Sequence, residues 1–144
     1  MSRVIFLARI VLAVLLIGAG ALKVGHAPDL AAAIAGFRIL PAAFTAPLAL
    51  ILPYFELLLG AYIAIGLFTR VASIVAAVQF VAYAAAIASA VIRGIPANCG
   101  CFGPHDTAVA DWPHVAFDLV IAALCAFIAY GAPGALAADR RVQN

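Results

Sequence analysis

Two cysteines separated by one glycine, Cys99 and Cys101, are the residues of this chain best suited to carry chemistry. A disulfide requires Cα atoms about 4.4 to 6.8 Å apart and a dihedral angle of about 90°, and the small ring of a Cys-Gly-Cys bridge meets these values only under strain. The intervening glycine lets the backbone bend far enough to close the ring. Because strained, accessible disulfides are typically the labile and catalytic ones, the motif favours a reversible dithiol/disulfide pair. Two metal ligands or two unreactive thiols are the alternatives.

The composition indicates a membrane protein. The chain has 144 residues, of which 68% are hydrophobic and 10% are charged, and its mean hydropathy is +1.21. A soluble domain has about half apolar and about a quarter charged residues. The net charge of +2 is scattered rather than clustered, which argues against nucleic acid as a partner. We therefore predict a single domain, residues 1–144, whose main partner is the lipid bilayer.

Four apolar runs are long enough to cross a hydrocarbon core about 30 Å thick at about 1.5 Å per residue. They cover residues 4–22, 46–68, 71–92 and 112–130. The short turn Thr69-Arg70 predicts that the third span runs antiparallel beside the second. In the first loop, Pro28-Asp29 followed by apolar residues at helical spacing indicates a short interfacial helix, with a plain connecting segment as the alternative. The expected fold is an all-α, four-helix transmembrane bundle with a short interfacial helix in the first outer loop.

The first run allows a second interpretation, because Ala19-Gly20-Ala21 resembles the cleavage site of a signal peptide. We favour a transmembrane span, since the run exceeds the usual signal-peptide core of about 7 to 15 residues and its glycines are typical of closely packed membrane helices. Its single charge, Arg9, lies near the start of the run, from where the side chain is expected to snorkel to the interface.

The distribution of basic residues predicts the orientation. Five lie at the two termini and the Thr69-Arg70 turn, and three lie in the other two loops. This bias predicts a multi-pass protein of the bacterial inner (cytoplasmic) membrane with both termini in the cytoplasm. The cysteine loop then lies outside, where disulfides form and persist.

Four charged residues are expected to gather beneath the cysteine loop: Lys23, Glu56, Arg93 and Asp118. Lys23 and Arg93 end the first and third spans at the outer face, whereas Glu56 and Asp118 lie about 15 Å and about 9 Å below it. An isolated charge in hydrocarbon costs about 2.5 to 3.5 kcal/mol, so these side chains should face inward and pair. We expect Glu56 to pair with Lys23 or Arg93, and Asp118 with Arg93.

This polar cavity has a functional and a structural interpretation. It could lower the pKa of a thiol, move protons during dithiol oxidation, or hold a polar ligand. It could equally be a salt-bridge network that fixes the spans to one another. Gln79 is expected to link helices, and Cys125 to be an inert apolar side chain.

A metal site is the remaining candidate in the loop, because His105 and His114 accompany the two cysteines. The spacing argues against it, since Cys-x-Cys is shorter than the usual gap between zinc ligands. We assign no metal ligand.

Five short segments together resemble the family of the methylamine utilisation protein MauE and its DoxX-like relatives. They are Gly20-Ala-Leu-Lys23, Leu52-Pro-Tyr-Phe-Glu56 with Leu59-Gly60, Gly66-Leu-Phe-Thr-Arg70, Arg93-Gly94 and Cys99-Gly-Cys-Phe-Gly103. The resemblance covers nearly the whole chain. One position departs from the family pattern: Phe117 stands where an arginine commonly precedes the acidic residue of the fourth span.

The resemblance implies a redox-associated membrane protein that supports disulfide formation or maturation of exported proteins, as in assembly of the disulfide-rich small subunit of methylamine dehydrogenase. It implies an extracytoplasmic thioredoxin-like partner and makes Cys99 and Cys101 the catalytic pair of a thiol-disulfide oxidoreductase or of an accessory to one. Cys99, near Arg93, is expected to be the attacking sulfur and Cys101 the resolving one. A quinone among the spans is a candidate electron acceptor without a sequence feature specific to it. The alternative function is binding or transport of a soft metal ion or small solute by the same loop and the Lys23/Glu56 cavity.

Overall fold

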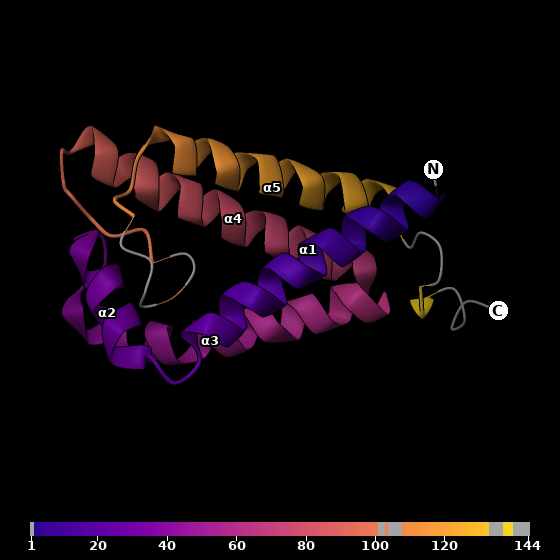
Figure 1. Ribbon diagram of the computed structural model, residues 1–144, viewed down its shortest axis with the longest axis horizontal. Helices are drawn as coiled ribbons and strands as arrows, with labels where there is room; N and C mark the ends of the chain where they lie inside the picture. The colour runs from indigo at the N-terminus through magenta and orange to yellow at the C-terminus, as the bar shows by residue number, and fades with distance from the viewer. Residues whose placement is uncertain (1, 101–102, 104–107, 133–136, 140–144) are drawn as a thin grey trace.

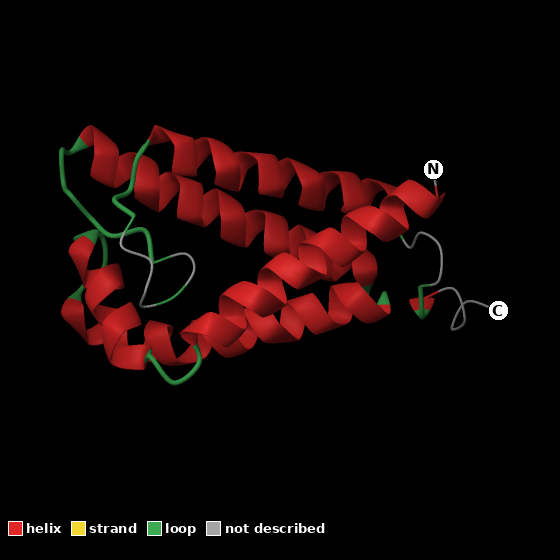
Figure 2. Ribbon diagram, viewed as in Figure 1, coloured by secondary structure: helices red, strands yellow, loops and turns green. Residues whose placement is uncertain are grey.

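The computed structural model describes residues 2–100, 103, 108–132 and 137–139, and these residues are almost entirely helical (Figure 2). The helices are α1 (Ser2–Lys23), α2 (Ala27–Gly36), α3 (Ala42–Ile65), α4 (Thr69–Ile92) and α5 (Trp112–Gly131). By length and composition, α1, α3, α4 and α5 can each cross a membrane, and α2 is the short helix between the first two. The predicted fold class is confirmed.

The long helices pair as α1 with α3 and as α4 with α5 (Figure 1). Residues 66–68 join α3 to α4, yet these two helices share far fewer contacts than either pair. The two helices run in opposite directions, as predicted (Figure 1), and they touch where Gln79 and Tyr83 bind Glu56. The prediction that they pack beside each other along their length is wrong. A short connection fixes where two helices meet, but side-chain packing decides which helices stay together.

The turn itself also lies earlier than predicted, because Thr69 and Arg70 already belong to α4. The carboxylate of Asp139 explains this boundary. It accepts hydrogen bonds from the backbone N–H groups of Phe68, at 2.7 Å, and Thr69, at 2.8 Å, which would otherwise lack partners at the start of a helix. These bonds hold the pKa of Asp139 below its usual value, although partial burial acts in the opposite direction. The tail thus fixes where α4 begins.

The apolar core lies where the four long helices cross, with buried side chains such as Leu12, Ile63, Ala76 and Ile128. Large apolar side chains also cover the outside of the bundle; Val14 and Val120, for example, are 65% and 66% exposed. Such a surface suits hydrocarbon rather than water.

The two ends of the bundle differ in content (Figure 1). The start of α1, the α3–α4 turn and the end of α5 lie at one end, whereas α2 and the described residues of the cysteine loop lie at the other. Which end faces the cytoplasm stays a prediction.

Arg9 does not snorkel, contrary to the prediction. Its side chain is fully buried and donates hydrogen bonds of 3.1 Å from Nε to the carbonyl of Ile63 and from a terminal nitrogen to that of Ala64. The last carbonyls of a helix lack intrahelical partners and carry partial negative charge. The end of α3 therefore supplies partners for the guanidinium inside the bundle.

The backbones of α1 and α3 approach closely at Gly20. A Cβ atom at this position would lie 2.7 Å from the backbone carbonyl oxygen of Pro53, so only glycine fits without moving a helix. Lys23 follows Gly20 by one turn, and a helical side chain leans back toward the start of its helix. The close approach therefore brings the Lys23 ammonium to the face of α3 that carries Glu56.

We expect Gly20→Ala to destabilise the bundle by about 1 to 3 kcal/mol, because the added methyl group must separate two backbones. Gly18→Ala is the matched control, since nothing lies within 4 Å of a Cβ there and alanine favours helix. Thermal unfolding of both variants in detergent measures the difference. Equal midpoints for the two would show that α1 and α3 are not in close contact at Gly20.

Candidate functional site

The described part of the cysteine loop is held by backbone hydrogen bonds between its two arms. Cys99 N–H donates to the carbonyl of Ala108 at 2.9 Å, and Ala110 N–H donates to that of Ala97 at 2.8 Å. Cys99 is disulfide-bonded. Cys101, its predicted partner, lies outside the described residues. The loop therefore presents Cys99 on an anchored backbone.

The Cys99 side chain is only 9% exposed, and it packs in a small apolar cluster at the ends of α4 and α5 that includes Ile87 and Val115. The next residue, Gly100, has a φ of 62°, which glycine adopts at little cost. A Cβ atom there would lie 3.2 Å from the Ala33 side chain of α2. The hinge between the predicted cysteine pair thus lies directly against α2.

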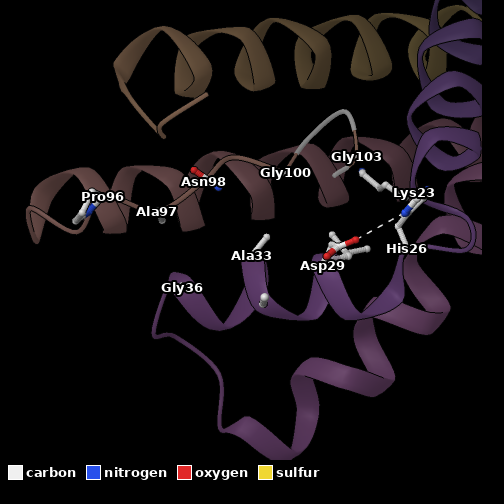
Figure 3. Close-up of a pocket in the computed structure, with 12 residues that line it drawn as sticks. Lys23, His26, Asp29, Ala33, Gly36, Pro96, Ala97, Asn98, Gly100 and Gly103 are labelled. Atoms are coloured by element: carbon white, nitrogen blue, oxygen red, sulfur yellow. Dashed lines mark ion pairs between the residues drawn. The ribbon is translucent and has the colours of Figure 1, made fainter. Parts of the chain in front are cut away.

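An open groove of about 620 Å³ separates α2 from the cysteine loop (Figure 3). Its polar lining includes Lys23, His26, Asp29 and Asn98, and its other walls are largely alanine and glycine. His26 Nδ1 lies 3.7 Å from Asp29 Oδ2, and both side chains are substantially exposed. The volume is in the range of small-molecule sites, about 300 to 1,000 Å³.

Below the groove, Lys23 and Glu56 form a buried ion pair. Lys23 Nζ lies 2.9 Å from Oε1 and 3.0 Å from Oε2 of Glu56, and the two residues are 3% and 1% exposed. Glu56 Oε1 also accepts hydrogen bonds from Tyr83 Oη, at 2.7 Å, and Gln79 Nε2, at 3.1 Å. The predicted Lys23–Glu56 pair and the role of Gln79 in linking helices are both confirmed.

Tyr83 is the member of this cluster that sequence reasoning missed. Its hydroxyl also accepts a hydrogen bond of 2.8 Å from Gln79 Nε2, and the Lys23 ammonium lies 5.8 Å from the centre of its ring. The available signal was the i, i+4 spacing of Gln79 and Tyr83, which places two polar groups on one face of a helix.

Asp118 reaches the same region from α5. It is 3% exposed, and its Oδ2 atom is buried without a hydrogen-bond partner among the described residues. Asp118 lines a small cavity of about 30 Å³ together with Lys23, Glu56 and Tyr83. The structure therefore brings three of the four predicted charged residues together.

Arg93 is the exception, so its predicted pairing with Glu56 or Asp118 is wrong. Its side chain is exposed and donates hydrogen bonds to the backbone carbonyls of Phe37 and Arg38, just after α2. These carbonyls lie at a helix end, where intrahelical partners are missing. Arg93 links α4 to the end of α2 rather than serving the cavity.

The start of α5 is fixed by Asp111, whose carboxylate accepts a hydrogen bond from His114 N–H at 3.1 Å and pairs with the His114 ring. These bonds hold the pKa of Asp111 below its usual value, and the bond to the His114 ring has the largest effect. The cap sets the register of α5 and so the position of Asp118.

Three or more potential metal ligands do not gather anywhere among the described residues. Two of the ligands considered for a metal site, Cys101 and His105, are outside that part of the chain. Cys125 is a free, fully buried thiol in the apolar core, as expected.

Comparison with known proteins gives one consistent result. The family model described as methylamine utilisation protein MauE matches residues 1–131. The methylamine utilization protein MauE of Paracoccus denitrificans is 32% identical over 137 residues, covering 94% of this chain and 74% of that protein. No solved structure matches the chain.

Breaking the buried ion pair should be strongly destabilising. We expect Lys23→Met and Glu56→Gln each to lower the free energy of unfolding by about 3 to 5 kcal/mol, because each leaves one buried group without its partner. The double variant should lose less than the sum of the two. Equilibrium unfolding in mixed micelles measures the cycle.

Asp29→Asn is the control for this cycle, since the His26–Asp29 pair is exposed and its loss should change stability by less than about 1 kcal/mol. Additive effects of Lys23→Met and Glu56→Gln would mean that the two side chains do not interact in the bilayer.

Proposed function

Because the chain belongs to the MauE family of methylamine utilisation proteins, we propose that it is a membrane thiol-disulfide exchange protein that supports disulfide formation in exported proteins. Its exchange partner is an extracytoplasmic thioredoxin-like protein. The observation that carries the proposal is the disulfide-bonded Cys99, held on an anchored loop beside an open groove.

In this proposal the reactive disulfide joins Cys99 to Cys101. A thiolate of the reduced partner attacks one loop sulfur, which forms a mixed disulfide and releases the other as a thiolate. The second partner thiol then displaces the loop cysteine. The partner loses two electrons and two protons and gains a disulfide, and the loop becomes a dithiol.

The burial of Cys99 changes the roles expected from the sequence. A cysteine residue that is 9% exposed and packed on α4 and α5 is a poor target for in-line attack on its sulfur. Its expected helper Arg93 is engaged with carbonyls near α2. We therefore assign the first contact with the partner to Cys101 and the resolving role to Cys99.

Turnover requires that the reduced loop passes two electrons onward. We propose a quinone as the electron acceptor. Quinones dissolve in the lipid bilayer, and the four apolar helices of this protein are long enough to cross the same bilayer. The loop then lies on the outer side of the membrane and both chain ends on the cytoplasmic side, in line with the bias of basic residues.

Labelling of intact cells tests the orientation and the redox state together. In a Cys125→Ser background, we expect a membrane-impermeant maleimide to label the protein only after treatment with reductant. Permeabilised cells without reductant serve as the control. Labelling that requires permeabilisation even after reduction would place the loop in the cytoplasm and contradict the proposal.

Trapping tests the exchange itself. We expect the Cys101 thiolate of Cys99→Ser to attack the disulfide of the oxidised partner and release one partner thiolate; without Cys99 to resolve it, the variant should accumulate a reductant-sensitive adduct with an exported protein. Cys101→Ser should accumulate less of it, because Cys99 is buried, and Cys125→Ser should accumulate none. Non-reducing electrophoresis followed by mass spectrometry identifies the adduct. Absence of adducts from both loop variants would refute exchange.

A binding or transport function is the second candidate, and the groove of about 620 Å³ favours it. The Lys23/Glu56 cavity is too small for an organic solute, with a volume of about 30 Å³, so a solute or soft metal ion would occupy the groove. Metal analysis of the purified protein distinguishes the two. Near-stoichiometric metal that is lost in Cys101→Ser would favour binding over exchange.

A further inference from the structure

Two acidic side chains, Glu56 and Asp118, are buried beside Lys23 in a cluster with Tyr83. Among the described residues, Asp118 is the one of these two acids that has a carboxyl oxygen without a hydrogen-bond partner. Glu56 accepts hydrogen bonds from three side chains, whereas Asp118 Oδ2 is buried without a partner. A buried carboxylate oxygen without a hydrogen bond is costly in surroundings of low dielectric constant. The structure thus contains an acid that requires either a proton or a further ligand.

The groups that face Asp118 come from all four long helices. Lys23 on α1, Glu56 on α3 and Tyr83 on α4 line the same cavity, and His114 lies one turn earlier on α5. The Lys23 ammonium already binds both oxygens of Glu56. If Asp118 were also ionised, the buried cluster would carry a net negative charge among apolar side chains, which burial strongly disfavours.

The size of the cavity restricts what could compensate this charge. A volume of about 30 Å³ has room for about one water molecule. A metal cation needs several oxygen ligands, but the neighbouring ammonium would repel it and the remaining walls, such as Leu16, Phe80 and Ile121, are apolar. A proton needs only the carboxyl group itself, and a single water could accept its hydrogen bond.

The cavity is also close to the surface at one point. Lys23 lines both the small cavity and the large groove beside the cysteine loop, and Figure 3 shows it at the edge of that groove. Lys23 therefore lies where the groove and the cavity adjoin.

We propose that Asp118 is a buried proton-binding site: its side chain is a neutral carboxylic acid at neutral pH, and its proton exchanges with the open groove past Lys23. The proposal does not depend on the disulfide chemistry, because no cysteine among the described residues lines the cavity beside Asp118.

Infrared spectroscopy of the protein in lipid bilayers tests this site. We expect a carbonyl stretching band of a protonated carboxylic acid at neutral pH that is lost in Asp118→Asn and retained in Asp29→Asn, the exposed control. Transfer to D₂O should move the band to lower wavenumber, since the proton exchanges. A missing band, or one that D₂O leaves unchanged, would overturn the proposal.

Isotope labelling keeps the test decisive if Asp118→Asn does not fold. Glu56 is the only glutamate in the chain, so aspartate labelled with ¹³C in its side-chain carboxyl group separates the two buried acids. A shift of the band in the labelled wild-type protein supports Asp118. An unshifted band would assign the proton to Glu56 and contradict the proposal.

Discussion

The buried ion pair between Lys23 and Glu56 is the interaction on which the arrangement of this bundle depends. Apolar side chains of a membrane protein are as well solvated by lipid as by one another, so they give helices little reason to choose specific neighbours. An ammonium or carboxylate group in hydrocarbon, in contrast, needs a partner of opposite charge, and only an arrangement of helices that brings the two groups together provides one. The distance of 2.9 Å between Lys23 Nζ and Glu56 Oε1 fixes α1 against α3. Tyr83 and Gln79 on α4 donate hydrogen bonds to the same carboxylate and so link α4 to this pair.

The pair also requires that the backbones lie close together. Gly20 permits this approach, because a larger residue would strike the carbonyl of Pro53. The long Lys23 side chain then spans the distance from the end of α1 to the buried face of α3. Sequence features that look independent, a glycine in one span and a carboxylate in another, are therefore parts of a single contact.

The Lys23–Glu56 contact lies between a large groove and a small cavity. The groove between α2 and the cysteine loop is open and partly polar, whereas the cavity beside Asp118 is small and mostly apolar. Lys23 lines both. The groove and the small cavity thus meet at a side chain from the end of α1.

The two arginines that the sequence misplaced share a physical explanation. Arg9 and Arg93 were expected to reach the interface and a carboxylate, respectively. Both instead bind backbone carbonyls at helix ends. Carbonyl groups are present in every helix and leave no trace in the sequence, so reasoning from charged residues alone overlooks them as partners.

The sequence by itself determined the four spans, and it narrowed the segment after the first span to a short helix or a plain connection and the partner of Glu56 to Lys23 or Arg93. These follow from local length, hydropathy and the energetic need to pair charges in lipid. Tertiary structure alone decided that α4 packs mainly on α5 rather than on α3, that Cys99 is buried and that Asp118 faces a small cavity. Each of these features depends on how side chains from distant parts of the chain fit together. The spacing of residues along a single helix does not predict that fit.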